Sequence, residues 1–130
     1  MPHLHPAPSL EAVLQHAEAH AQRFCDDSGF TEPFRDMVVT VLVGAAAICP
    51  TDLRARPRWS KIPVHPYLDE LDAMVGYDDE AFAVSVMILI GFYEWLAERR
   101  VIRAHKAAKI LRKLRTRLPV AGSGTPPLFN

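Results

Sequence analysis

The sequence predicts an all-α fold, a single-domain bundle of about five helices with a long proline-rich loop between the second and the third. Apolar side chains recur at three- and four-residue steps in several segments, which is the period of one helix face. Two apolar runs of 13 residues, 37–49 and 81–93, fit buried helices, and no neighbouring segment of similar character offers a partner strand. The 130 residues are enough to bury one core.

The first two helices are predicted from their capping residues and from the points where they must stop. Residues 10–25 form one apolar stripe, and Ser9 precedes them in the position of an N-cap. The second helix is predicted over residues 31–48, because Thr31 can cap it and Pro50 stops it. Its second half is apolar on all sides, so we expect it to be the most buried helix.

The rest of the fold follows a segment rich in proline. Residues 51–66 hold or adjoin four prolines and are predicted to form a long loop. A short helix is predicted over residues 67–75, and a long, buried one over residues 79–100, with Asp78 as its N-cap. The last helix is predicted over residues 103–118, where an apolar stripe at helical spacing ends before a proline.

The two ends of the chain differ in composition from the predicted helical domain of residues 9–118. Residues 1–8 hold three prolines and residues 119–130 have linker composition, so both are predicted to be flexible tails. The chain begins without a secretory signal, and both apolar runs are shorter than the roughly 20 residues that a spanning helix needs. Its two cysteines lack CxxC spacing. We therefore predict a cytoplasmic protein with free thiols and no membrane partner.

The net charge of zero conceals a strong segregation of charge along the chain. Residues 99–117 carry nine Lys and Arg side chains and no acid, and residues 54–61 carry four more, again without an acid. The rest of the chain has two basic side chains against all 15 acidic ones. A zero sum therefore does not exclude nucleic acid or another polyanion as a partner.

We predict that these two basic windows form a surface for a polyanion or a protein partner. Cations on the last helix could lie along phosphates, while Trp59 and Tyr67 could serve as exposed aromatic anchors beside the loop. The alternative is that the same cations are solvated, or pair with acidic helices of this chain or of a second copy. The candidate binding residues are Arg54, Arg56, Arg58, Trp59, Lys61, Arg103, Lys106, Lys109, Arg112, Lys113, Arg115 and Arg117.

Two further patterns are weak candidates for a metal or haem site. His16 and His20 lie four residues apart on a predicted helix, which lets two imidazoles face one metal ion, but no third ligand is fixed by spacing. Cys49 precedes Pro50, a dipeptide that could act as a regulatory haem thiolate, yet this proline already ends a helix. We therefore predict no cofactor.

The sequence favours a binding role over catalysis. It lacks the nucleophile-elbow, phosphate-loop and dinucleotide-binding patterns, so we predict that the chain is not an enzyme. The leading hypothesis is a small helical adaptor or inhibitor that contacts a protein partner, or itself, through its charge-polarised surface. The alternative is a regulator that binds DNA or RNA through residues 99–117 and 54–61, and a minor alternative is a metal- or haem-binding protein. Length and composition suit a bacterial or phage accessory protein.

Overall fold

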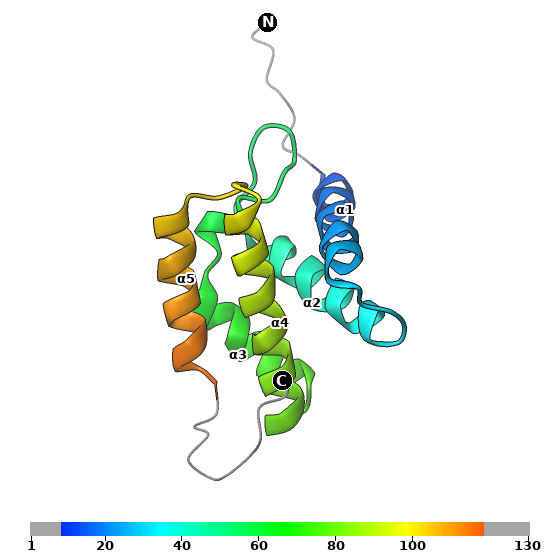
Figure 1. The fold of residues 1–130 in the computed structure, drawn as a ribbon, viewed down its shortest axis with the longest axis vertical. Helices are drawn as coiled ribbons and strands as arrows, with labels where there is room; N and C mark the ends of the chain where they lie inside the picture. The colour runs from blue at the N-terminus through cyan, green and yellow to red at the C-terminus, as the bar shows by residue number, and fades with distance from the viewer. Residues whose placement is uncertain (1–8, 119–130) are drawn as a thin grey trace, which may run out of the picture. The chain divides into compact units, whose positions relative to one another are not determined.

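The structure is a computed structural model that describes residues 9–118, most of which are helical (Figure 1). It confirms the predicted all-α class, with five α-helices and no strand among the described residues. The predicted tails, 1–8 and 119–130, lie outside these residues. The helices are α1 (Leu10–Ser28), α2 (Phe34–Ile48), α3 (Val64–Met74), α4 (Asp79–Glu98) and α5 (Ala104–Thr116), and a 3-10 turn, η1, spans Trp59–Lys61.

The C-terminal end of α1 and the start of α2 differ from the predicted boundaries. The hydroxyl of Ser9 caps α1 as predicted, accepting from the N–H of Ala12 at 3.2 Å. The helix then continues to Ser28 and ends at Gly29, whose φ of 74° is favourable for glycine. The helix α2 begins at Phe34, three residues later than predicted, because a proline disfavours helical dihedrals in the residue before it, here Glu32.

The helix α3 begins earlier than the prolines suggested. It starts at Val64, with Pro63 in the N-cap position and Pro66 in the first turn. Proline is tolerated there because the first amides of a helix have no intrahelical partner. The prediction of a loop up to residue 66 was therefore wrong at its end, and residues 49–63 connect α2 to α3.

The chain divides between Ile62 and Pro63 into two compact units. In the first, α1 packs against α2, and an Arg35 guanidinium joins the two helices. Its Nε donates to Gln22 Oε1 at 2.7 Å, and its Nη1 lies 2.8 Å from Asp26 Oδ1. These contacts hold the end of α1 beside the start of α2.

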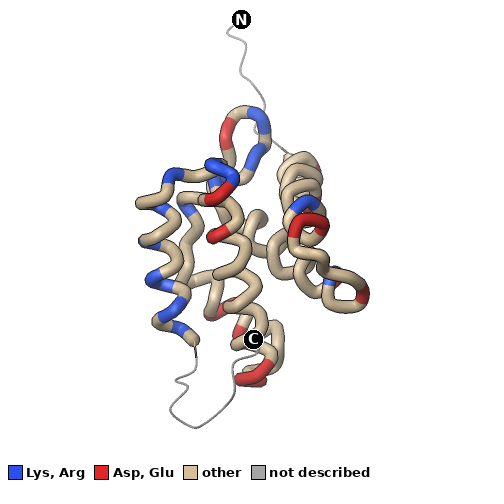
Figure 2. Tube along the Cα trace, viewed as in Figure 1, with Lys and Arg blue, Asp and Glu red and all other residues tan. Residues whose placement is uncertain are grey.

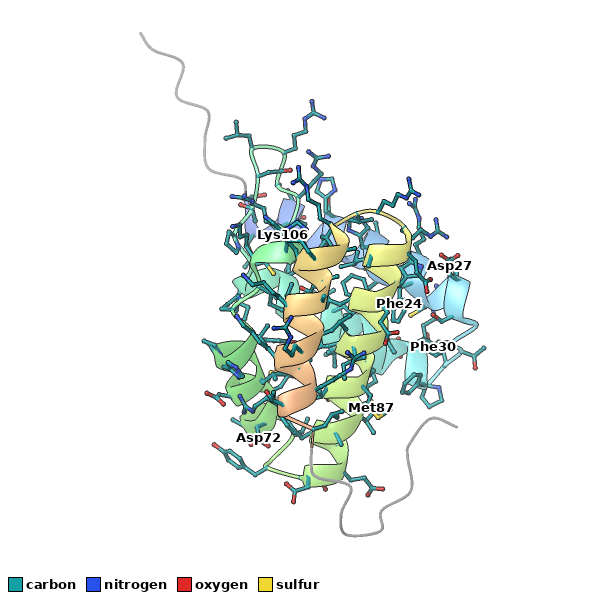
Figure 3. All side chains as sticks on the ribbon, turned by 60° about the vertical axis from the view of Figure 1, so that its left-hand side comes forward. Phe24, Asp27, Phe30, Asp72, Met87 and Lys106 are labelled. Atoms are coloured by element: carbon teal, nitrogen blue, oxygen red, sulfur yellow. The ribbon has the colours of Figure 1, made fainter. Side chains whose placement is uncertain are left out.

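An aromatic cluster closes the connection between α1 and α2. The rings of Phe24 and Phe30 meet edge to face with centroids 5.6 Å apart, and Phe30 meets Phe34 in the same way at 5.1 Å (Figure 3). Such pairs contribute about 0.5–1.5 kcal/mol beyond the area that they bury. Phe30 thus holds the turn against both helices of the first unit.

In the second unit, α5 and α3 both pack against α4 and against each other. The helix α4 is buried along most of its length, including Phe92, Tyr93 and Leu96. By length and composition α4 could also cross a membrane, but half of its most apolar window is buried in the structure. Core helices pass the same test, so its composition is explained by the packing of this unit.

Candidate functional site

The helix α5 is strongly amphipathic. Ala107, Ile110 and Leu114 are buried and fix the helix on the second unit. Apart from the half-buried Leu111, the side chains on its other faces are polar or small, and these are exposed except for Lys106, which is half-buried. We call five of them the basic face of α5, namely Lys106, Lys109, Arg112, Lys113 and Arg115.

The basic face is not neutralised by any acid among the residues that the structure describes. Residues 99–117 contain no acid, and basic positions recur along the whole of α5 (Figure 2). Among residues 9–118, no carboxylate forms an ion pair with any of the five cations. Neighbours such as Lys109 and Lys113 lie four residues apart on one helix, where like charges are destabilising by a few tenths of a kcal/mol. An external polyanion would relieve this repulsion.

The start of α5 carries further cations, which lie at the positive end of the helix dipole. Arg103 occupies the N-cap position but supplies no side-chain cap, and Lys106 lies in the first turn. Both are unfavourable placements, because the N-terminus of a helix already carries a partial positive charge. Arg99 and Arg100 are exposed just before this point. The junction of α4 with α5 therefore adds three exposed cations, Arg99, Arg100 and Arg103, beside the basic face.

Arg117, also a predicted binding residue, is held inside the second unit. Its Nη2 lies 2.7 Å from Asp69 Oδ1 on α3, and its Nη1 lies 3.3 Å from Nδ1 of His65. Its guanidinium also sits over the ring of Phe82 on α4, 5.8 Å from the centroid. Arg117 thus ties the end of α5 to both neighbouring helices and is not part of the basic face.

The other basic window forms an ordered loop in the first unit. Asp52 Oδ1 accepts from the backbone N–H groups of Arg54 and Arg56 at 2.8 and 3.0 Å. Its Oδ2 accepts from Nε of Arg56 at 2.8 Å. These bonds, led by the one from the N–H of Arg56, lower the pKa of Asp52. Arg54, Arg58 and Lys61 are exposed, whereas the charge of Arg56 is paired.

The prediction that Trp59 and Tyr67 are exposed anchors is wrong. Each side chain is only 2% exposed. The Nε1–H of Trp59 donates to Nδ1 of His20 at 3.2 Å, and the two rings meet edge to face. Trp59 lies in the 3-10 turn η1 and is buried in the core of the first unit. No local sequence pattern predicts its contact with His20, which is 39 residues away. Neither aromatic is available to stack on a base.

The two histidines proposed as metal ligands have different environments. His16 is exposed, while His20 is half-buried and its Nδ1 accepts the bond from Trp59. Burial is the main cause that lowers the pKa of His20, with smaller effects from Arg23 and His16. Among residues 9–118, no three His, Cys, Asp or Glu side chains gather in a way that could hold a metal ion.

Both cysteines are free and buried. Burial raises the pKa of Cys49 to about 12, and it is also the main cause that raises the pKa of Cys25. Both groups are therefore thiols at neutral pH. A cysteine ligates haem iron as a thiolate, and the burial of Cys49 opposes the ionisation of its thiol.

Sequence reasoning did not select three apolar side chains that are exposed in the structure. Leu53 at the tip of the ordered loop is 88% exposed, and Met74 and Tyr77, at the turn between α3 and α4, are 65% and 71% exposed. The two basic windows lie in different units, so each is described as its own surface. Comparison of the chain with protein-family models, with curated proteins and with solved structures gives no match.

Proposed function

We propose that the chain is a non-enzymatic regulator that binds the phosphate backbone of nucleic acid through the basic face of α5. The observation that carries this proposal is a row of five cations on one rigid, acid-free helix with no ion pair to any described carboxylate. Each phosphate that such a cation neutralises releases a counterion, which makes binding favourable at low salt.

The composition of the basic face favours a polyanion over a protein as its partner. The centres of protein interfaces are enriched in aromatic residues and depleted in lysine. Apart from the five cations, the exposed positions of α5 hold Ala104, His105, Ala108 and Thr116, none of which is a large apolar anchor. A surface that offers only charge fits a partner that offers only charge.

We further propose that binding reads the backbone of a duplex and not its bases. Recognition of single strands relies on exposed aromatic side chains that stack on bases. Trp59, which we expected to fill this role, is buried against His20. The helix α5 is about 20 Å long at 1.5 Å per residue, enough to follow several phosphates. Binding should therefore depend weakly on sequence and strongly on salt.

The adaptor or inhibitor hypothesis, which the sequence alone favoured, is the second candidate function here. Exposed Leu53, Met74 and Tyr77 favour it, because large apolar side chains at the surface are what protein contacts use. These residues lie outside α5. The two candidate functions therefore use different surfaces and can be tested separately.

The proposal is tested by fluorescence anisotropy of the full chain with a labelled random duplex of about 20 base pairs, titrated at salt concentrations from about 50 to about 200 mM. If all five cations contact phosphates, the slope of log K against log salt should approach about −4.5. Absence of binding at the lowest salt, or a flat slope, would contradict the proposal.

A pair of triple variants locates the binding surface. Changing Lys109, Arg112 and Lys113 to Ala should make the slope shallower by about 3, because three phosphate contacts are lost. Changing Arg54, Arg58 and Lys61 to Ala removes the same charge from the loop and should leave the slope unchanged. Equal effects of the two variants would mean that net charge, and not the basic face, determines binding.

A further inference from the structure

Exposed apolar side chains are concentrated in two short turns. Of the five large apolar side chains that are exposed among residues 9–118, three are Leu53, Met74 and Tyr77. Leu53 lies in the loop between α2 and α3, and the other two lie where α3 gives way to α4. Single exposed apolar residues are common, but each of these turns also carries charge of one sign.

The first turn is a rigid basic knob, which we define as residues 50–58. Two backbone hydrogen bonds join its two sides. The N–H of Asp52 donates to the carbonyl of Arg56 at 3.0 Å, and the N–H of Arg58 donates to the carbonyl of Pro50 at 2.8 Å. Arg56 neutralises Asp52, the sole acid of the segment. Leu53 is therefore presented on an ordered tip flanked by the free cations Arg54 and Arg58.

The second turn is an acidic apolar patch, which we define as residues 72–80. Its backbone is also ordered, since the N–H of Tyr77 donates to the carbonyl of Asp72 at 2.8 Å. Exposed Asp78, Asp79 and Glu80 follow Tyr77 directly. Asp78 caps α4, whereas no described cation pairs with Asp79 or Glu80. Arg117 also reaches this end of the unit, where Asp69 holds its guanidinium.

We infer that the basic knob of one copy of this chain docks on the acidic apolar patch of a second copy. Leu53 would contact Met74 and Tyr77, while Arg54 and Arg58 would pair with Asp79 and Glu80. A second copy is the occupant that the charges favour, because one chain carries both halves of the contact, with opposite signs and with exposed apolar residues in each.

A two-fold dimer would use this contact twice, since each copy offers one knob and one patch. The two turns are small, so each contact buries less than the area of a standard stable interface. We therefore expect a weak dimer that dissociates as salt screens the charge pairs. This association does not depend on the basic face of α5, so it goes beyond the function proposed above.

The oligomeric state of the full chain tests the inference. Sedimentation velocity at protein concentrations up to about 1 mM should show a monomer–dimer equilibrium. Leu53→Ser should weaken the dimer at least about tenfold, as should Tyr77→Gly. The second variant also relieves the positive φ of 58° at this position, so it should not lose stability. A matched control is Leu10→Ser, which removes another exposed leucine and should leave the dimer intact.

Charge reversal gives the sharper test. The double variant Arg54→Glu with Arg58→Glu should be monomeric, as should Asp79→Lys with Glu80→Lys. An equimolar mixture of the two should form a heterodimer, because both pairs of knob and patch then have opposite charges. A monomeric wild-type chain, a dimer that both Leu53→Ser and Tyr77→Gly leave intact, or a mixture that stays monomeric would overturn the inference. The α5 triple variant should dimerise normally, which separates failure here from failure of nucleic-acid binding.

Discussion

The two basic windows are residues 54–61, the loop window, and residues 99–117, the helical window. They resemble each other in sequence but form different kinds of surface. At the loop window, Asp52 pairs with Arg56, the side chain of Trp59 is buried in the core, and Leu53 is exposed at the tip. On α5, no described carboxylate pairs with the five cations, and no exposed position holds a large apolar side chain. A run of Lys and Arg therefore does not define a function until the residues between the charges have been placed.

The difference between the windows follows from what each must do for the fold. The loop turns the chain back on itself between α2 and α3, which requires the hydrogen bonds of Asp52 and the burial of Trp59. The helix α5 needs only one apolar stripe to dock, so its remaining faces are free to carry charge. Some residues of the loop window are thus used to stabilise the fold, whereas most cations of the helical window are free to contact a partner.

The largest effect that we expect on stability comes from the aromatic of the loop window. Trp59→Ala should lower the free energy of unfolding by about 3–5 kcal/mol, because it leaves a cavity in the core and removes the hydrogen bond to His20. Chemical denaturation monitored by circular dichroism measures the change. A decrease of less than about 1 kcal/mol in the free energy of unfolding would indicate that Trp59 is exposed, as the sequence had predicted.

The burial of His20 should also make the stability depend on pH. The pKa of His20 is lowered in the folded state, so the unfolded chain takes up a proton first as the pH falls below the ordinary value of 6.5. Stability is therefore retained above that pH and lost below it, until the folded state is protonated as well.

The measurement is the free energy of unfolding of the wild type and of His20→Gln between about pH 7.5 and pH 5. The advantage of the wild type should shrink as the pH falls, whereas other titrating groups affect both proteins alike. An advantage that is constant over this range would contradict the assignment of a neutral His20.

The smallest effect that we expect on stability comes from replacing Arg117. This substitution distinguishes cations of the helical window that stabilise the fold from those that bind a partner. Arg117→Met should cost less than about 1 kcal/mol of stability, because Asp69 is largely exposed and solvent screens the pair. It should leave the salt slope of nucleic-acid binding unchanged. A slope that became shallower by about 1 would place Arg117 among the phosphate contacts.

The sequence predicted those features that depend on local patterns. Apolar periodicity located all five helices, and Ser9 and Asp78 were correctly identified as N-caps. The helix boundaries at Val64 and Phe34 were less accurate, because a proline can either start a helix or delay it. The stripe of Ala107, Ile110 and Leu114 was sufficient to predict which side of α5 faces solvent.

The features that escaped prediction depend on contacts between distant residues. Trp59 meets His20 from a position 39 residues further along the chain, and Arg117 meets Asp69 across 48 residues. Neither spacing has a periodic signature. The exposure of Leu53 likewise results from the hydrogen bonds that shape its loop and not from its own chemistry.

The most direct test of this account is a titration of the isotope-labelled full chain with duplex DNA, followed residue by residue through backbone amide shifts in NMR spectra. We expect the shifts to concentrate at residues 103–116, on the basic face of α5, while the amides of residues 50–62 stay unchanged. Shifts centred on the loop, or equal shifts in both windows, would contradict the claim that only the helical window is a polyanion-binding surface.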